Sequence, residues 1–185
     1  MRSRKALFLD RDGIINVNHG YVSQPQDIQF IDGIFALCKA ALNKDYLIIV
    51  VTNQSGIARN YYSRDDFQAL TRWIEHQFWR RGVIITHTFH CPHHPKQKRP
   101  FGLNCCCRKP RPGMITKAQR HYGIDLSRSI LVGDSLSDIQ CAQNAGVKKS
   151  VLFKANSIQY RPQLIWGCNK PYYQASDLKA VRQLL

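Results

Sequence analysis

The sequence predicts an α/β fold, a doubly wound, Rossmann-like parallel sheet with helices on both faces. Three observations predict this fold: short apolar runs, helical patterns between those runs, and polar side chains where the runs end. Short, wholly apolar runs are typical of strands buried on both faces of a parallel sheet. Strands that alternate with helices indicate βαβ units. The expected strands cover residues 6–9, 47–51, 83–89, 130–132 and 150–153.

The intervals between these strands carry helix signals. Ser63 and Asp66 resemble a capping box, and Gly82 lies where the helix that follows would end. Gly123 ends a later helix in the same way, and Ser176 is expected to cap the last one. Besides the helix between Ser63 and Gly82, the expected helices cover residues 34–43, 114–122, 137–144 and 176–184.

Length and composition bound the class of protein. The chain has 185 residues, and we expect them to form a single domain over residues 1–185. No run of 18 apolar residues is present, so no transmembrane helix is expected. The apolar stretch near the start ends at Asp10, which is too early for a secretory signal, so we expect a cytoplasmic protein. The net charge of +15 favours an anionic partner, either nucleic acid or a phosphorylated metabolite, unless it serves solubility alone.

Acidic residues gather at two of the expected strand ends. Asp10 and Asp12 follow the first strand, two residues apart, so both side chains can face one reaction centre, and Gly13 lets the chain turn away. Asp134 follows a later strand, and the three acids together predict a Mg²⁺ site. A single aspartate after a strand is more often a turn or cap residue, and we interpret Asp138 as a first-turn helix charge.

Groups that suit a phosphate lie between the two acidic strand ends. Thr52 ends the second strand, and its hydroxyl and the backbone N–H groups of the turn at 53–56 can donate to phosphate oxygens. Arg108 and Lys109 supply positive charge, and Lys109 can neutralise charge that builds in a transition state. The competing interpretations are a polar turn and a solvated charge pair.

Clustered cysteines indicate a second metal site. The stretch 91–112 is too long for an ordinary connection. Cys91, His93, Cys105 and Cys107 form a C-x-H and C-x-C set that suits tetrahedral Zn²⁺, and a closed site of this kind is structural. A loop of free thiols is the alternative, and spacing alone leaves three further candidate ligands open: His90, His94 and Cys106. The isolated cysteines are interpreted as small buried or indifferent side chains: Cys38, Cys141 and Cys168.

These motifs, in this order along the chain, resemble the haloacid dehalogenase superfamily of phosphotransferases. The segment from Asp10 to Gly13 matches its first motif, Thr52 its second, Lys109 its third and Asp134 its fourth. The resemblance implies that Asp10 attacks phosphorus and forms an aspartyl-phosphate. It further implies that Asp12 is the general acid and base. Mg²⁺ is implied at the Asp10 carboxylate, the Asp12 carbonyl and Asp134, with no large cap domain.

A narrower resemblance rests on residues 16–21, 52–59, 91–95 and 105–114. They are similar to the D-glycero-D-manno-heptose-1,7-bisphosphate 7-phosphatases and their histidinol-phosphatase relatives. The heptose family removes the C7 phosphate in the synthesis of lipopolysaccharide precursors. The resemblance implies a zinc loop at about 91–107 with ligands Cys91, His93, Cys105 and Cys107. It also implies substrate contacts from ten residues: Asn18, His19, Gly20, Tyr21, Thr52, Asn53, Gln54, Ser55, Arg108 and Lys109.

Two positions depart from the heptose pattern. Ile14 stands where threonine is usual, and Ser135 stands where lysine is usual, so the exact substrate is less well specified than the reaction. The alternatives are a histidinol-phosphate phosphatase, a nucleic-acid 3′-phosphatase and a non-enzymatic zinc module that binds nucleic acid. Between Cys91 and Cys107 the zinc module would offer only Phe101 for base stacking. We therefore expect a monomeric enzyme that uses Mg²⁺ and Zn²⁺ on a small phosphorylated sugar, with no nucleic-acid or membrane partner.

Overall fold

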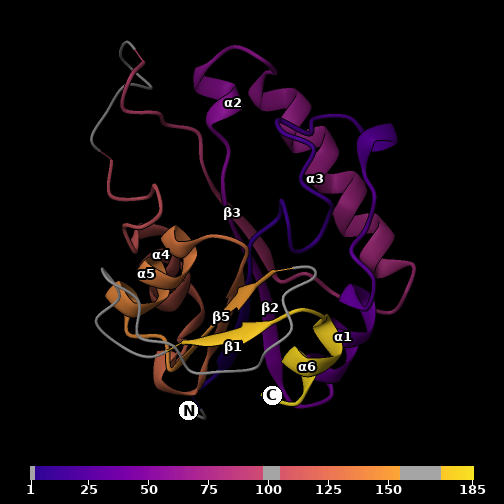
Figure 1. Ribbon diagram of the computed structural model, residues 1–185, viewed down its shortest axis with the longest axis vertical. Helices are drawn as coiled ribbons and strands as arrows, with labels where there is room; N and C mark the ends of the chain where they lie inside the picture. The colour runs from indigo at the N-terminus through magenta and orange to yellow at the C-terminus, as the bar shows by residue number, and fades with distance from the viewer. Residues whose placement is uncertain (1–2, 98–104, 155–171) are drawn as a thin grey trace.

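A computed structural model describes residues 3–97, 105–154 and 172–185. In these ranges six parallel strands form one sheet in the order β3-β2-β1-β4-β5-β6. Figure 1 shows this sheet with helices around it. The predicted doubly wound parallel sheet is therefore confirmed. The strands are β1 (Lys5–Leu9), β2 (Tyr46–Asn53), β3 (His87–Cys91), β4 (Ile130–Gly133), β5 (Lys149–Phe153) and β6 (Tyr173–Ala175).

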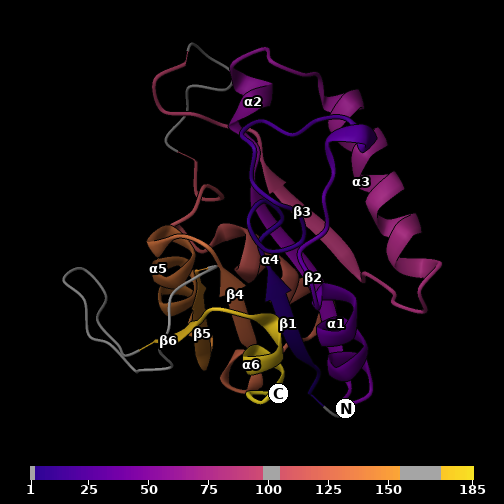
Figure 2. The same ribbon diagram turned by 45° about the vertical axis from the view of Figure 1, so that its right-hand side comes forward.

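Helices cover both faces of the sheet. Figure 2 shows α4 and α5 on one side and α1 and α3 on the other. Over the described ranges no cap domain interrupts this arrangement, and no helix there is long and apolar enough to cross a membrane. The α-helices are α1 (Ile34–Leu42), α2 (Ser55–Ala58), α3 (Arg64–Trp79), α4 (Gly113–Tyr122), α5 (Leu136–Ala145) and α6 (Leu178–Arg182), and two 3₁₀ turns are η1 (Pro25–Asp27) and η2 (Leu126–Arg128).

The central strand β1 shows how the sequence produces the two packed layers. Successive side chains of a strand point to opposite faces of the sheet. Leu7 and Leu9 pack in the core that contains α1 and α3, whereas Ala6 and Phe8 pack in the core that contains α4 and α5. All four are fully buried. A strand buried on both faces must be apolar throughout, which is why β1 gave such a clear sequence signal.

Helix ends follow local rules at most of the predicted positions. The capping box is confirmed, because Asp66 Oδ2 accepts from the Ser63 amide at 2.8 Å and Ser63 Oγ accepts from the Asp66 amide at 3.0 Å. Gly123 ends α4 in the left-handed region, with φ +63°. The prediction of Ser176 as the last cap is wrong. Asp177 caps α6 instead, accepting from the Ala180 amide at 2.7 Å.

The third and sixth strands depart from the sequence prediction. The third was expected at 83–89, but pairing with β2 begins only at His87. Val83 is apolar because it packs in the core, while Ile84 is 65% exposed, so this apolar run is a connection. Strand β6 was not expected, because three residues at the sheet edge carry too short a pattern to recognise. Cys168 lies outside the described residues.

Candidate active site

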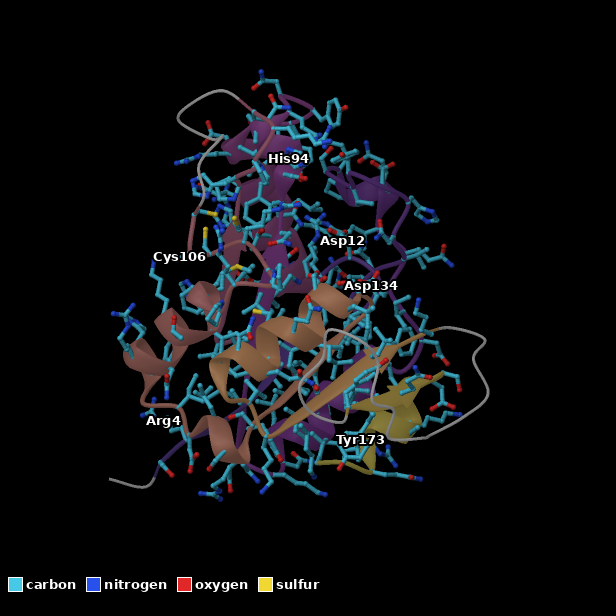
Figure 3. The ribbon with its side chains drawn as sticks, turned by 60° about the vertical axis from the view of Figure 1, so that its left-hand side comes forward. Arg4, Asp12, His94, Cys106, Asp134 and Tyr173 are labelled. Atoms are coloured by element: carbon cyan, nitrogen blue, oxygen red, sulfur yellow. The ribbon has the colours of Figure 1, made fainter. Side chains whose placement is uncertain are left out.

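A cavity of about 280 Å³ lies at the carboxyl ends of β1, β2 and β4. Figure 3 shows Asp12 and Asp134 close together there, with Arg4 at the opposite end of the sheet. The structure brings together all of the predicted catalytic, Mg²⁺ and substrate residues except two. His19 lines a neighbouring cavity, and Arg108 lies beside the cysteine loop. Three lining residues were not predicted: Tyr62, Ser135 and Ser137.

Asp10 stands at the floor of the cavity, one residue beyond β1. Its amide donates to the Val132 carbonyl at 3.0 Å, which continues the sheet and fixes its direction. Its Oδ1 accepts from the Arg11 amide at 2.7 Å, and its Oδ2 lies 2.9 Å from Lys109 Nζ. Burial raises the pKa of Asp10 to about 7; Lys109 opposes this rise and Asp138 adds to it. Asp10 therefore needs nearby positive charge to remain an ionised nucleophile.

Lys109 is buried among acceptors. Its Nζ lies 2.9 Å from Asp10 Oδ2, 2.5 Å from Asp138 Oδ1 and 3.0 Å from the Val51 carbonyl. Burial alone would lower the pKa of Lys109, but the charges of Asp10 and Asp138 outweigh it and raise that pKa. The ammonium group is therefore held charged beside Asp10. The interpretation of Lys109 as part of a solvated charge pair is wrong, because the residue is only 4% exposed.

Asp138 has a second role that the sequence did not reveal. It is a first-turn residue of α5, as interpreted, and its Oδ2 accepts from the Ser135 amide at 3.1 Å and Oγ at 2.6 Å. Its Oδ1 also pairs with Lys109, from a fully buried position. A signal for this approach was Gly133, where a Cβ atom would collide with the Asp138 side chain.

Asp12 is held at the rim of the cavity by several donors. Arg11 forks onto it, with Nε 3.1 Å from Oδ1 and Nη2 2.9 Å from each oxygen. Asn16 Nδ2 donates to Oδ1 at 3.1 Å, and Gln54 Nε2 donates to Oδ2 at 3.0 Å. Arg11 is buried and also donates to the Val22 carbonyl at 2.8 Å. Sequence reasoning assigned no role to Arg11 or to the Asn16 side chain, both of which orient this carboxylate.

Thr52 and Gln54 form the side of the cavity at the end of β2. Thr52 Oγ1 accepts from Gln54 Nε2 at 2.9 Å, which leaves the hydroxyl hydrogen for another acceptor. The expected turn after Gln54 is instead the short helix α2. Tyr62 reaches back from beyond α2 and donates to Gln54 Oε1 at 2.5 Å. Tyr62 was missed because this contact depends on how the chain returns after α2.

The acidic side chains can hold a divalent cation. Carboxylate oxygens of Asp10, Asp134 and Asp138 lie within 4.8 Å of one another. Burial, and then the charge of Asp138, raise the pKa of Asp134, so ionising the whole group calls for a cation in addition to Lys109. Asp10 and Asp134 line the cavity, whereas Asp138 is fully buried behind it, so Asp10 and Asp134 are the better ligands. Gly13 permits Asp134 to approach the chain closely, because a Cβ atom at residue 13 would collide with the Asp134 side chain. Gly13 also has a φ of +84°, which glycine adopts without strain.

The cysteine loop gathers four metal-binding side chains, Cys91, His93, Cys105 and Cys107, with their ligand atoms within 4.8 Å of one another. Sγ of Cys91 lies 3.5 Å from Sγ of Cys105 and 3.1 Å from Sγ of Cys107, and His93 Nδ1 lies 3.3 Å from Sγ of Cys107. Disulfide sulfurs would be ~2.05 Å apart, whereas a Zn–S bond of ~2.3 Å separates two ligands by roughly 3.8 Å. The sulfur spacing is too long for a disulfide and nearer to that of zinc ligands, and the donor set suits zinc.

The other candidate ligands lie elsewhere. Cys106 is exposed and stands outside this group. His94 is paired with Arg59, whose Nη2 lies 3.0 Å from His94 Nε2. The ring of His90 packs against Phe67, with centroids 4.3 Å apart.

Hydrogen bonds connect the cysteine loop to the cavity. Arg108 Nη1 donates to the His93 carbonyl at 3.1 Å, joining the two arms of the loop. The next residue, Lys109, donates its amide to Asn53 Oδ1 at 3.1 Å, at the end of β2. The Cys106 carbonyl accepts from the Gly113 amide at 3.0 Å, where α4 begins. The loop therefore helps to fix the place at which Lys109 enters the core.

The fold and this site define a hydrolase of the haloacid dehalogenase type, and residues 106–179 match the family model described as HAD-hydrolase-like. Individual relatives match a longer part of the chain than this family model does. The D-glycero-beta-D-manno-heptose-1,7-bisphosphate 7-phosphatase of Haemophilus ducreyi is 45% identical over 152 residues, or 82% of this chain and 84% of that protein. The alpha-anomer 7-phosphatase of Campylobacter jejuni is 43% identical over 80% of this chain and 81% of that protein.

A solved structure agrees with these relatives. The D,D-heptose 1,7-bisphosphate phosphatase from B. bronchiseptica, complexed with magnesium and phosphate, has a TM-score of 0.81 and 28% identity, covering 97% of each chain. The chain therefore belongs to the D-glycero-D-manno-heptose-1,7-bisphosphate 7-phosphatase family, and it is a phosphoric monoester hydrolase.

Proposed function

We propose that this enzyme hydrolyses the C7 phosphate of D-glycero-D-manno-heptose 1,7-bisphosphate, leaves the C1 phosphate in place, and so supplies lipopolysaccharide precursor synthesis. The observation that carries the chemistry is the buried Asp10 carboxylate, paired with Lys109 in the floor of a cavity that Asp12 and Thr52 border. The names of the relatives carry the choice of sugar. We treat residues 1–185 as one phosphatase domain with a zinc loop at about 91–107.

In the first step, a carboxylate oxygen of Asp10 attacks phosphorus, and the bond between phosphorus and the C7 oxygen breaks. The departing alkoxide takes the proton of the Asp12 carboxyl group. Lys109, beside Asp10, offsets the repulsion between the carboxylate and the phosphate. The Thr52 hydroxyl accepts from Gln54 and donates its hydrogen to a phosphate oxygen.

In the second step, water attacks the phosphorus of the aspartyl-phosphate. The Asp12 carboxylate accepts a proton from that water, and the bond between phosphorus and Asp10 breaks. Inorganic phosphate leaves, and both aspartates return to their starting states. The donors on Asp12 keep it directed at the same centre through both steps: Arg11, Asn16 and Gln54.

Two metals support this scheme. Asp10 and Asp134, with the Asp12 carbonyl, would hold Mg²⁺, which supplies charge neutralisation between the nucleophile and the phosphate. The raised pKa of Asp10 and of Asp134 supports such a cation. Cys91, His93, Cys105 and Cys107 would hold structural Zn²⁺. Four protein ligands leave no position for substrate, so zinc shapes the loop that carries Arg108 and Lys109.

We assign the remaining substrate contacts to the cavity rim. Asn18, Gly20 and Tyr21 line it from the loop after β1, while Asn53 and Ser55 line it from the end of β2. His19 lines the adjoining cavity of about 460 Å³, which offers room for the rest of the sugar. Arg108 approaches from the zinc loop, where its positive charge suits an anionic substrate.

We further propose a monomeric, cytoplasmic enzyme without a nucleic-acid partner. The grouped thiols support a reducing compartment, since zinc-binding thiolates must not be oxidised. The cavity is bordered by the acids Asp10, Asp12 and Asp134, which suits a small substrate that arrives with Mg²⁺.

A phosphate-release assay over four substrates tests the proposal: the heptose 1,7-bisphosphate, the heptose 7-phosphate, histidinol phosphate and 3′-phosphorylated DNA. We expect the bisphosphate to have the highest kcat/KM, and ³¹P NMR to show that the C1 phosphate remains. Holding the remote phosphate helps to orient the reacting one, so the 7-phosphate should have a lower kcat/KM. A higher kcat/KM for histidinol phosphate would contradict the substrate assignment, while leaving the Asp10 chemistry intact.

A further inference from the structure

The side chain of Gln54 is buried, and each of its polar atoms has a protein partner. Its Oε1 accepts from the Tyr62 hydroxyl at 2.5 Å. Its Nε2 donates to Asp12 Oδ2 at 3.0 Å and to Thr52 Oγ1 at 2.9 Å. Gln54 lines the cavity but is only 1% exposed, so its side chain connects the neighbouring cavity residues to one another.

The direction of these hydrogen bonds is determined by the chemistry of the partners. Gln54 Nε2 donates to Asp12 Oδ2, and a carboxylate, the form in which Asp12 acts as the base of the second step, can only accept. Tyr62 donates to the amide oxygen, and this hydrogen bond stabilises that same orientation. Burial raises the pKa of Tyr62 to about 12, so the phenol keeps its proton near neutral pH. Tyr62 thereby determines which end of the Gln54 amide faces Asp12.

Tyr62 is itself held firmly. Its ring packs with Ile57 and Phe67 in a small buried cluster. It also covers Gly56 so closely that a Cβ atom there would collide with the ring. The next residue, Ser63, begins the capping box of α3. Packing on one side and a helix cap on the other restrict the movement of the hydroxyl group.

We propose that Tyr62 is a positioning residue for the general acid: its hydroxyl fixes the Gln54 amide, and that amide holds Asp12 at the reacting centre. The inference rests on the proposed function, in which Asp12 protonates the leaving oxygen. Without the hydroxyl, the buried Gln54 oxygen loses its donor, and the amide is no longer fixed in the orientation that donates to Asp12. The carboxyl group is then held less firmly at the leaving oxygen.

Dependence on the leaving group separates this role from general damage to the site. A sugar alkoxide needs a proton from Asp12 as it leaves, whereas p-nitrophenolate is stable enough to leave without one. For both substrates, kcat/KM reports the steps up to and including formation of the aspartyl-phosphate. A displaced acid therefore lowers kcat/KM for the sugar bisphosphate more than for p-nitrophenyl phosphate. Loosened packing lowers both alike.

The experiment compares Tyr62→Phe with Tyr46→Phe. Tyr46 is another buried tyrosine, but it begins β2 at the opposite end of the sheet. We expect Tyr62→Phe to lower kcat/KM for the sugar bisphosphate by about 10- to 100-fold. This factor corresponds to loss of the hydrogen bond from Gln54 to the Asp12 carboxylate. We expect less than about threefold for p-nitrophenyl phosphate, and Tyr46→Phe should leave both values unchanged. Equal losses on the two substrates in Tyr62→Phe would overturn the inference.

Gln54→Met completes a double-mutant cycle, because methionine keeps the length of the side chain and removes its hydrogen bonds. If Tyr62 acts through Gln54, adding Tyr62→Phe to Gln54→Met should change kcat/KM by less than about twofold. A full, additive loss would show that Tyr62 acts by another route. Asp12→Asn identifies the source of a failure. If Asp12→Asn itself shows no dependence on the leaving group, the general-acid assignment fails, and the inference with it. If Asp12→Asn discriminates and Tyr62→Phe does not, the inference alone fails.

Discussion

Replacing Asp138 with asparagine separates two roles that one carboxylate performs. Asparagine keeps the size of the side chain and an acceptor for the Ser135 cap, but it removes the charge that faces Lys109. Lys109 would remain buried with Asp10 as its single carboxylate partner. A buried hydrogen bond to a charged group contributes about 1.5–3 kcal/mol, and leaving a buried charge wholly unpaired costs about 3–5 kcal/mol. Because Asp10 remains, we expect the free energy of unfolding to fall by about 2–3 kcal/mol.

Activity should fall as well, because Asp138 helps to hold the Lys109 ammonium group beside Asp10. We expect kcat/KM to decrease by about 10- to 100-fold, less than the loss of a transition-state donor altogether. Urea denaturation and a phosphate-release assay measure the two effects. Asp177→Asn is the matched control: Asp177 also caps a helix, but it is exposed. It should lower stability by about 0.3–1 kcal/mol and leave kcat/KM unchanged. If the two variants behave alike, Asp138 is a helix-cap charge and no more.

The remaining predictions concern the glycine beside Asp134 and the cysteines. Gly13→Ala should lower the free energy of unfolding by more than Gly123→Ala does. Both glycines have positive φ, but only a Cβ atom at residue 13 would also collide with Asp134. Urea denaturation measures both losses, and equal losses would contradict the close approach of Asp134 to Gly13. Cys107→Ser should lower both the zinc content and kcat/KM, whereas Cys106→Ser should change neither. Elemental analysis measures the zinc content, and a parent protein without zinc would contradict the proposed zinc site. Iodoacetamide at pH 8 should label exposed Cys106 before buried Cys38. Burial raises the pKa of Cys38 to about 12, which leaves roughly 10⁻⁴ of this thiol as thiolate at pH 8. Peptide mass spectrometry identifies the labelled residue, and earlier labelling of Cys38 would contradict its burial.

The parts of the fold and site that the sequence predicted depend on local patterns. Strand β1 is apolar because it is buried on both faces, and Asp10 follows it directly, so periodicity alone placed that carboxylate at the sheet edge. The same reasoning placed Thr52 and Asp134 at neighbouring strand ends, and the structure brings all three to one cavity. Ser63 and Asp66 satisfy each other within one turn, so their capping box was also visible in the sequence.

The parts that the sequence did not predict depend on contacts between distant residues. Asp138 and Lys109 are 29 positions apart, and Gly133 signals only that the Asp138 side chain approaches β4 closely, not that it pairs with Lys109. The connection of Tyr62 to Asp12 through Gln54 likewise requires the path of the chain around α2. The third strand was predicted too early because Val83 is apolar. Val83 packs in the core although it lies in the connection before β3, and the sequence does not distinguish it from a buried strand residue.

The measurement that tests the account most directly is the position of the covalent phosphate. The enzyme is mixed with the heptose bisphosphate and Mg²⁺, quenched rapidly in acid, and reduced with borohydride, which converts a phosphorylated aspartate to homoserine. Peptide mass spectrometry then locates the homoserine. We predict it at position 10, and we predict its loss in Asp10→Asn. Homoserine at any other aspartate, during turnover of the same substrate, would contradict the assignment of Asp10 as the nucleophile.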